Sequence, residues 1–597
     1  MSVLETPRIL FKGEITWDPI VTNNYDTFYN EDTDSPVWPP APDRVAAFRQ
    51  EAIKSVITGT WNPDGTHRST FYNTAISGVD LGSGVVGDPF VAAASNFTGM
   101  LVDLEPYGTL TSQLYFDAMR FGIDGGYRIF CKRSSRATAR YVNFSRNPAN
   151  AMIAGIASVI WQTSFAKADG LLVDAFDSPA LQCLAEKLKS DEVLGLTVQF
   201  NTYRTVYYDN LALTNSSPLT KQAAQKLIAD LERGGFQPNP ARSVMVGVIG
   251  LWRKGEPAHE PGDRALLTQD GSPAASAHAR LGANSLTLDF SNSLPEDSKD
   301  LEKSNLGTLT VAAVGPSGAG SKLGEIPYAQ YSKQAYETGS GIISLPLTTD
   351  QVKAVADMDL QVIGGNGTVL LAEVALRAIP LIPNLYLDQG ETGTAAFQVY
   401  RRGVPAKGPL PVTVYKMSAD GGSIENTTNL QTNANGLLSF SVTGTVGGIF
   451  AYVPAPVPGA TPPNTGINPQ TNNYMYIRTL NADADVAALP PTWENVYGRV
   501  LANWNAMAPC MDNWLMLNDP VRVKAQAATL KRLTDPANFE SFLFMPVTRD
   551  MTAGGRALLY KFLDAPGDGT TAGVAVTGKR ELSFAEKSRA MRRQREE

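Results

Sequence analysis

The chain of 597 residues contains few of the side chains that hold metals or form disulfides. It has three histidines and three cysteines, and the cysteines stand far apart at positions 131, 183 and 510. A site with several histidine ligands would need nearly all of the histidines. An odd, sparse set of cysteines is not typical of a disulfide framework and favours a reducing compartment. We therefore expect no metal and no cofactor.

Charged residues and long apolar runs are scarce as well. Asp, Glu, Lys and Arg make up 18% of the sequence, against about 25% in typical globular proteins. The net charge of −7 gives no general attraction for nucleic acid. No window approaches about 18 consecutive apolar residues, the length of a transmembrane helix. The first residues, with Glu5 and Pro7, do not resemble a signal peptide. These features predict a cytoplasmic protein with no nucleic-acid partner and no transmembrane segment.

Short apolar runs separated by turn residues dominate the first two thirds of the chain. The sequence holds 52 glycines and 39 prolines, and runs of this kind are typical of antiparallel strands. Two runs, 193–200 and 244–252, are apolar almost throughout, which predicts strands covered on both faces. We expect a large antiparallel β-rich region over residues 1–385, and a division into two subdomains near residue 240 stays open.

The pattern changes near residue 386. Residues 386–480 contain alternating strands joined by turn-rich loops, as in an immunoglobulin-like sandwich, although no Cys–Trp–Cys framework is present. Residues 490–566 have apolar side chains at helical spacing, and Asp550 or Thr552 is suited to cap a helix at 553–564. A linker and a basic tail follow at 567–597. The expected fold class is mainly β and multi-domain, with a small C-terminal helical module.

Three segments imitate ligand-binding motifs without meeting their requirements. Residues 82–87 spell a dinucleotide fingerprint, but Asp-Pro follows where a helix should begin. Residues 315–322 resemble a phosphate-binding loop, but the lysine and the hydroxyl residue stand in the wrong order. Residues 481–492 begin like a calcium loop but lack its glycine and final glutamate. We interpret residues 315–322 as a Gly-rich hairpin loop and residues 481–492 as a capped linker between the sandwich and the helices, and we assign no nucleotide role to residues 82–87.

The candidates for catalysis are Asp103, Glu105, His67 and His259. The two acids could supply the carboxylate pair of a glycoside hydrolase, but the sequence does not give their separation. Each of these histidines follows an acid by three residues, and a neutral imidazole can act as a base near pH 7. The Glu256-x-x-His259 spacing also occurs among di-iron ligands on helices, but the prolines around it predict a loop. No nucleophile motif accompanies these residues. Structural or surface roles are the simpler interpretation, including for His278 in a loop-like Ala-Ser-Ala-His-Ala, and the catalytic residues stay unknown.

Five blocks of sequence, in order, resemble one family of biosynthetic enzymes. They are residues 7–13, 191–200, 245–256, 341–347 and 545–549. They are similar to the amino-terminal half of the iminophenyl-pyruvate (tryptophan-imine) dimer synthases of violacein and rebeccamycin biosynthesis, and the resemblance extends to about residue 564.

The resemblance implies a role in bacterial secondary metabolism. In that family a ferritin-like helical domain follows and carries Glu and His metal ligands, and this domain is the part implied to couple two indole-pyruvate imines. No such domain follows in this sequence, so no catalytic residue carries over. We expect a free-standing version of the non-ferritin half.

Three functions stay open. The first is a non-catalytic scaffold or binding subunit that assembles with separately encoded partners, among them a ferritin-like enzyme. The second is an enzyme or ligand-binding protein that acts on a small aromatic metabolite or a glycan in the β-rich region. The third is a self-assembling structural protein, since long strand edges permit association, and a homo-oligomer also stays open.

The basic tail is the expected docking segment. Residues 579–597 contain seven basic and four acidic side chains. Ser583 and Glu586 form a capping box, so a short helix is expected. We expect the tail to dock on a partner or a second copy. The residues expected to make this contact are Phe584, Met591, Arg592, Arg593 and Arg595.

Overall fold

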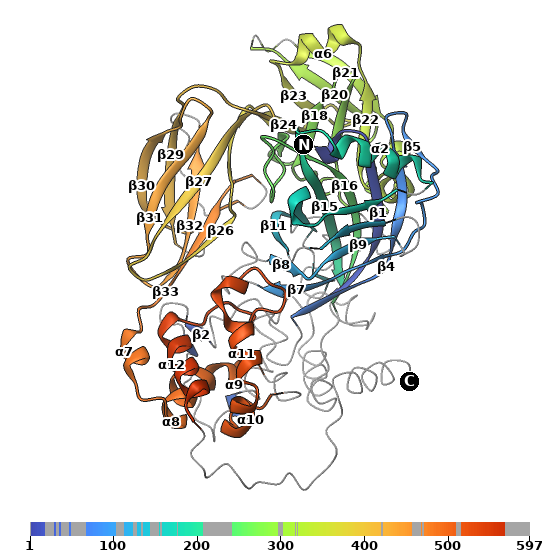
Figure 1. Ribbon diagram of the computed structural model, residues 1–597. Coiled ribbons are helices and arrows are strands. Elements are labelled where there is room, and N and C mark those ends of the chain that lie inside the picture. The colour runs from blue at the N-terminus through green and yellow to red at the C-terminus, as the bar shows by residue number, and fades with distance from the viewer. Residues whose placement is uncertain are drawn as a thin grey trace, which may run out of the picture.

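Three β units and a helical module make up the part of the chain that the structure describes (Figure 1). This computed structural model describes residues 2–17, 29–30, 35–36, 47–48, 67–102, 113–122, 128–132, 135–143, 154–155, 158–175, 177–206, 241–296, 302–316, 318, 320–418, 422–456, 467–468, 471–508 and 515–566. The fold is mainly β, the sheets are mostly antiparallel, and a small helical region lies toward the C-terminus. The predicted fold class is confirmed.

The first unit is a sheet that closes on itself. Strand β1 (Arg8–Trp17) pairs with β16 (Ala241–Arg253) on one side and with β4 (Arg68–Asp80) on the other. The path from β16 to β4 runs through β15 (Val193–Val206), β13 (Ser158–Ala166), β11 (Ser135–Asn143), β8 (Gln113–Phe116) and β7 (Thr98–Val102). The short strands β5 (Val85–Val86) and β12 (Ala154–Gly155) pair with β4 and β15. Because β16 is part of this sheet, the first unit continues past residue 240.

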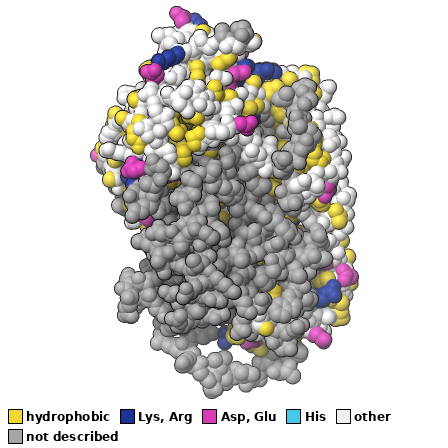
Figure 2. All heavy atoms as spheres, turned by 180° about the vertical axis from the view of Figure 1, so that it is seen from behind, with side chains coloured by type: hydrophobic (Ala, Val, Ile, Leu, Met, Phe, Trp, Pro, Cys, Tyr) yellow, Lys and Arg dark blue, Asp and Glu magenta, His cyan; other side chains and the backbone are white. Residues whose placement is uncertain are grey.

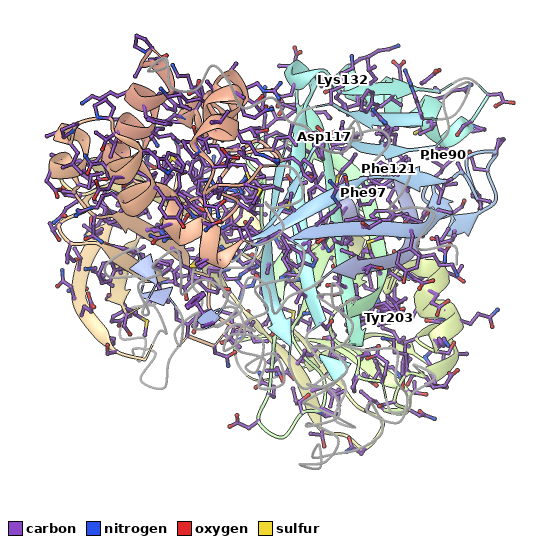
Figure 3. The ribbon with its side chains drawn as sticks, turned by 90° about the horizontal axis from the view of Figure 1, so that it is seen from below. Phe90, Phe97, Asp117, Phe121, Lys132 and Tyr203 are labelled. Atoms are coloured by element: carbon purple, nitrogen blue, oxygen red, sulfur yellow. The ribbon has the colours of Figure 1, made fainter. Side chains whose placement is uncertain are left out.

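Phenylalanine rings fill the inside of the closed sheet. The ring of Phe97 lies 4.3 Å from that of Phe71 and 5.4 Å from that of Phe121, centroid to centroid. Figure 3, seen from below, labels Phe97 and Phe121 beside these strands. Offset and edge-on aromatic pairs stabilise a core beyond the area they bury. The inside of this unit is therefore a packed core that holds the surrounding strands in place.

Strands β15 and β16 are covered on both faces, as their apolar sequences predicted. Phe200 and Ile249 belong to the inner core, whereas Val248 packs outward against Leu4 of the 3-10 helix η1 (Ser2–Leu4). A small sheet of β6 (Ser95–Asn96), β9 (Met119–Phe121), β10 (Arg128–Cys131) and β14 (Leu172–Asp174) contributes Phe121 and Ile129 to the inner core. The remaining short elements here are β2 (Tyr29–Asn30), β3 (Ser35–Pro36), η5 (Lys167–Asp169) and α2 (Pro179–Leu188).

The second unit is an eight-stranded antiparallel sheet. Its order is β21 (Gly320–Ile326), β20 (Leu309–Val314), β23 (Asp359–Ile363), β24 (Val369–Val374), β17 (Arg264–Thr268), β18 (Ala277–Leu281), β19 (Ser285–Asp289) and β22 (Ile342–Pro346). Its helices are η6 (Tyr328–Gln330), α5 (Lys333–Gly339) and α6 (Thr349–Val355). The glycine-rich segment 315–322 joins and enters the β20–β21 hairpin, so its interpretation as a hairpin loop is confirmed. His278 lies in β18 and is 1% exposed, so its expected loop position is wrong. The small alanines around it fit a buried strand.

The third unit is a sandwich of two sheets. One contains β25 (Leu376–Pro380), β27 (Thr392–Arg401), β28 (Val404–Pro405) and β31 (Leu437–Thr443). The other has the order β26 (Asn384–Asp388), β33 (Met475–Leu480), β32 (Gly448–Ala455), β29 (Pro411–Met417) and β30 (Ile424–Gln431), with β26 and β33 parallel. Because β25 pairs with β27, the sandwich begins ten residues before the predicted position 386.

The helical module lies beneath the closed sheet and the sandwich (Figure 1). Its elements are α7 (Ala484–Ala488), α8 (Trp493–Val496), the π-turn η7 (Tyr497–Leu501), α9 (Ala502–Met507), α10 (Pro520–Ala525), α11 (Ala527–Thr534), η9 (Pro536–Asn538) and α12 (Ala553–Asp564). Thr552 caps α12 as predicted. The Asp483 carboxylate accepts hydrogen bonds from the Gly554 and Gly555 amides, each at 2.8 Å. The calcium-like segment is thus a capped connector.

Two surface properties follow the composition. None of the described helices is long and apolar enough to cross a membrane. On the face seen in Figure 2, the described residues carry only scattered charged side chains among uncharged ones.

Candidate functional site

The structure places the two described candidates, His67 and His259, in different surroundings. His67 directly precedes β4 and lines a cavity beside the helical module. His259 lies in the loop between β16 and β17, at the meeting point of the three β units. Asp103 and Glu105 lie outside the described residues, as do all five tail residues expected to dock. Their roles stay predictions.

The loop of His259 is built around Glu256. The Glu256 carboxylate accepts a hydrogen bond from the Arg253 amide at 2.8 Å. The backbone carbonyl of Glu256 accepts a second one from the Trp252 indole at 3.0 Å. Arg280 lies 3.8 Å from the same carboxylate. Glu256 thus shapes a turn, and the loop predicted from its prolines is confirmed. His259 is half-buried rather than fully exposed.

A buried polar cluster joins the three β units, and we call it the junction. It consists of Arg140 and Tyr141 of β11, Glu260 of the β16–β17 loop, Arg377 of β25, and Asn473 before β33. The Glu260 carboxylate lies 3.2 Å from Arg140, 3.8 Å from Arg377 and 3.3 Å from the Tyr141 hydroxyl. Asn473 also donates to it. One carboxylate therefore compensates two buried guanidinium groups from different units.

Backbone carbonyls complete the junction. Arg377 donates to the carbonyls of Asp263 at 2.9 Å and Pro261 at 3.1 Å, and Arg140 donates to that of Tyr474 at 3.2 Å. Buried charges are tolerated when they are both paired and hydrogen-bonded. These contacts fix the sandwich and the second unit to the closed sheet.

A distortion in β11 directs Tyr141 into the junction. The pairing of β11 with β13 shifts its register between Arg140 and Asn143, and Tyr141 has a φ of 53°. A bulge re-aims a side chain in this way, and a non-glycine residue with positive φ is strained. Burial is the main cause that raises the pKa of Tyr141. The Tyr141 ring stacks edge-on with His278 at 4.6 Å, and burial lowers the pKa of that imidazole. Both groups are neutral at pH 7.

A cleft of about 680 Å³ opens beside the junction. Arg253, Arg280 and Arg402 line it. Each is paired with an acid: Arg253 and Arg280 with Glu5, and Arg402 with Asp359 at 2.6 Å. The Arg402–Asp359 pair holds the hairpin tip of the sandwich against the second unit, and Glu5 links Arg253 of the first unit to Arg280 of the second. The cleft therefore belongs to the same interdomain framework.

A smaller cavity of about 100 Å³ lies in the helical module, where His67 of the first unit borders it, and we call it the helical-module cavity. The described residues of its wall are apolar except for His67 and two threonines. Nδ1 of His67 lies 3.0 Å from the carbonyl oxygen of Leu101 in β7. Burial is the main cause that lowers the pKa of His67 to about 4. The ring is therefore neutral at pH 7.

Comparison with known proteins gives a distant relative. No protein-family model matches the sequence. Over 409 residues the chain is 25% identical to the 2-imino-3-(indol-3-yl)propanoate dimerase of Chromobacterium violaceum, and the match covers 65% of this chain and 35% of the dimerase. The chain is distantly related to the family of this dimerase. It spans about a third of that relative's length.

Likeness to solved structures is low. The fibronectin(III)-like modules of Clostridium thermocellum CbhA share 9% identity with this chain, cover 34% of it at 88% of their own length, and give a TM-score of 0.12. The D0-D1 domain of intimin shares 13%, covers 33% at 91% of its length, and gives 0.14. Scores this low carry no argument.

The junction residues were not found from the sequence. Glu260 follows His259 directly, but nothing near it indicates that it is buried with two arginines. Its partners lie far away in sequence, since Arg140 and Asn473 are 120 and 213 residues from it. Only the strand bulge at Tyr141 and the pairing of distant strands bring the set together.

Proposed function

We propose that this chain is a binding scaffold in a secondary-metabolite pathway, where it holds a separately encoded enzyme in a fixed position. The junction is the observation that carries the proposal. The distant relation to a dimerase of such a pathway supports the pathway class. A cytoplasmic location is part of the proposal and rests on the scarcity of cysteine, of which Cys131 and Cys183 are free thiols.

The junction suits a scaffold because it makes three units into one body. Domains joined by small polar contacts ordinarily move relative to one another. Here Glu260 and Arg140 are each 2% exposed in their side chains, and Arg377 is 8% exposed. Separating the units would leave buried charges without partners, which is strongly unfavourable. A frame of this kind holds binding surfaces at fixed distances.

The basic tail is proposed as the docking segment. Its excess of arginine over acidic side chains supports an acidic surface as its target. Deleting residues 567–597 is expected to abolish the complex with the partner. A variant with lysine in place of Arg592, Arg593 and Arg595 keeps the charge and is expected to retain most of the binding.

The test is reconstitution with the proteins encoded beside this chain. They are co-expressed with it and separated by size exclusion with light scattering. We expect co-elution with a ferritin-like enzyme, and a lower product yield from that enzyme when this chain is omitted. Separate elution from every neighbour with unchanged yield would overturn the proposal. Turnover of an aromatic imine by this chain alone would establish the enzyme alternative, and a large homogeneous particle would establish self-assembly.

A further inference from the structure

The helical-module cavity combines an apolar wall with three polar side chains among its described residues, His67, Thr534 and Thr548. The hydroxyl of Thr534 is hydrogen-bonded to the Leu530 carbonyl at 2.8 Å, and that of Thr548 to Asp550 at 2.6 Å. The Trp504 indole donates to Asp550 at 3.1 Å. Within the described part of the wall, only His67 keeps a ring nitrogen outside these pairs.

The hydrogen bond between His67 and Leu101 identifies which ring nitrogen of His67 carries the hydrogen. A carbonyl oxygen only accepts, so Nδ1 of His67 carries the hydrogen and donates. In a neutral imidazole the other nitrogen is then an acceptor. Burial lowers the pKa of His67 to about 4, so Nε2 stays an acceptor at pH 7. Among the described residues of the wall, His67 thus presents an imidazole acceptor in largely apolar surroundings.

We propose that the helical-module cavity binds a small planar aromatic molecule with one N–H or O–H donor, which donates to Nε2 of His67. Small-molecule sites are mostly apolar with a few placed polar groups. Trp504 and three methionines, Met507, Met545 and Met551, belong to the wall. Methionine sulfur makes favourable contacts with aromatic rings and adapts to their shape. A ligand donor would pair with Nε2 of His67.

The size of the cavity limits the ligand. Its volume of about 100 Å³ is below the roughly 150 Å³ of an engineered cavity that binds benzene. One ring therefore fills it with small shifts of the methionines, and a fused second ring or a substituent lies toward the half-buried Trp504, Met545 and Val547. Water is a poor occupant, because a buried water needs two to four polar partners. This inference does not depend on a protein partner.

The experiment is calorimetric titration of the full chain with indole, which has one N–H donor, and with indene, which has the same shape without it. The variant His67→Phe removes the acceptor and keeps a ring. We expect indole to bind the wild type saturably and His67→Phe about five- to tenfold more weakly, the worth of one hydrogen bond. Indene affinity should change less than twofold. Equal effects on both probes, or no saturable binding to the wild type, would overturn the proposal.

Two further measurements keep the test decisive. Ala508→Phe fills the cavity and is expected to abolish binding of both probes, with unchanged near-ultraviolet circular dichroism as the check on folding. If His67→Phe fails to fold, the wild type is titrated from pH 8 to pH 4. Indole affinity should then fall toward pH 4, where the ring gains a proton, while indene affinity stays constant. Parallel behaviour of the two probes would again contradict the proposal.

Discussion

The junction and the interface of the helical module both join units of this chain, but with opposite chemistry. The junction places Glu260 between Arg140 and Arg377. The helical interface is mainly aromatic: the guanidinium of Arg549 lies 3.7 Å from the Tyr115 ring centroid, and Tyr386 packs edge-on against Phe539 at 4.3 Å. One interface depends on directed hydrogen bonds and the other on ring packing.

The difference shows which interface can hold a ligand. In the junction each donor and acceptor has a required position, so a displaced group leaves a buried charge unsatisfied. In the helical interface, contacts between rings, methionines and leucines are non-directional and tolerate small shifts. The cavity beside His67 lies in this second interface. We infer that the junction fixes the frame and the helical interface supplies adaptable binding space.

The largest expected effect comes from Glu260→Gln. The amide keeps the shape but leaves Arg140 and Arg377 without their compensating charge, which should cost about 3–5 kcal/mol of unfolding free energy. Urea unfolding followed by tryptophan fluorescence measures it. The matched control is Glu192→Gln, which removes the exposed pair with Lys254 and should cost less than about 1 kcal/mol. Equal costs would show that the buried pairs of Glu260 contribute no more to the unfolding free energy than the exposed pair of Glu192.

Arg549→Met should have the next largest effect. Arg549 is 1% exposed and donates to the carbonyls of Val547 at 2.6 Å and Ser541 at 2.9 Å. Losing these bonds and the contact with Tyr115 should cost about 2–4 kcal/mol. Limited proteolysis should cleave the helical module faster than the β units. The exposed Arg532→Met is the control, and uniform cleavage of all units would contradict the expectation.

Local features of the fold could be predicted from the sequence. The cap Thr552, the hairpin at 315–322 and the buried runs of β15 and β16 each depend on neighbouring residues, and the structure has them. The mainly β class follows from the spacing of the apolar runs.

The features that depend on distant contacts could not be predicted. Closure of the first sheet needs β1 to pair with both β4 and β16. The junction needs Arg140 to reach the Tyr474 carbonyl, 334 residues away. For the candidate site, the sequence singled out His67 but not its cavity, because the opposite wall comes from residues 501–559.

Acidification should remove the part of the unfolding free energy that the neutral His67 ring contributes. Burial lowers the pKa of His67 from its ordinary 6.5 to about 4, so between these values the unfolded chain binds more protons than the folded one. The stability contributed by the neutral ring is complete above pH 6.5 and is lost as the pH falls toward 4, by about 3 kcal/mol at most. The unfolding free energy of the wild type minus that of His67→Gln should shrink over this window. His278 contributes to both proteins alike and cancels, and a constant difference would contradict the assignment.

The smallest expected effect comes from Thr552→Ala, which removes the N-terminal cap of α12. Thr552 accepts a hydrogen bond from the Gly555 amide at 3.3 Å and donates to Asp483, so Thr552→Ala should cost about 1 kcal/mol. Thr348→Ala removes the corresponding cap of α6 in the second unit and should cost a similar amount. Only Thr552→Ala should speed proteolysis of the helical module and weaken indole binding, because α12 contributes Leu559 to the cavity. If both variants weakened indole binding equally, the cavity would depend on global stability rather than on the packing of α12.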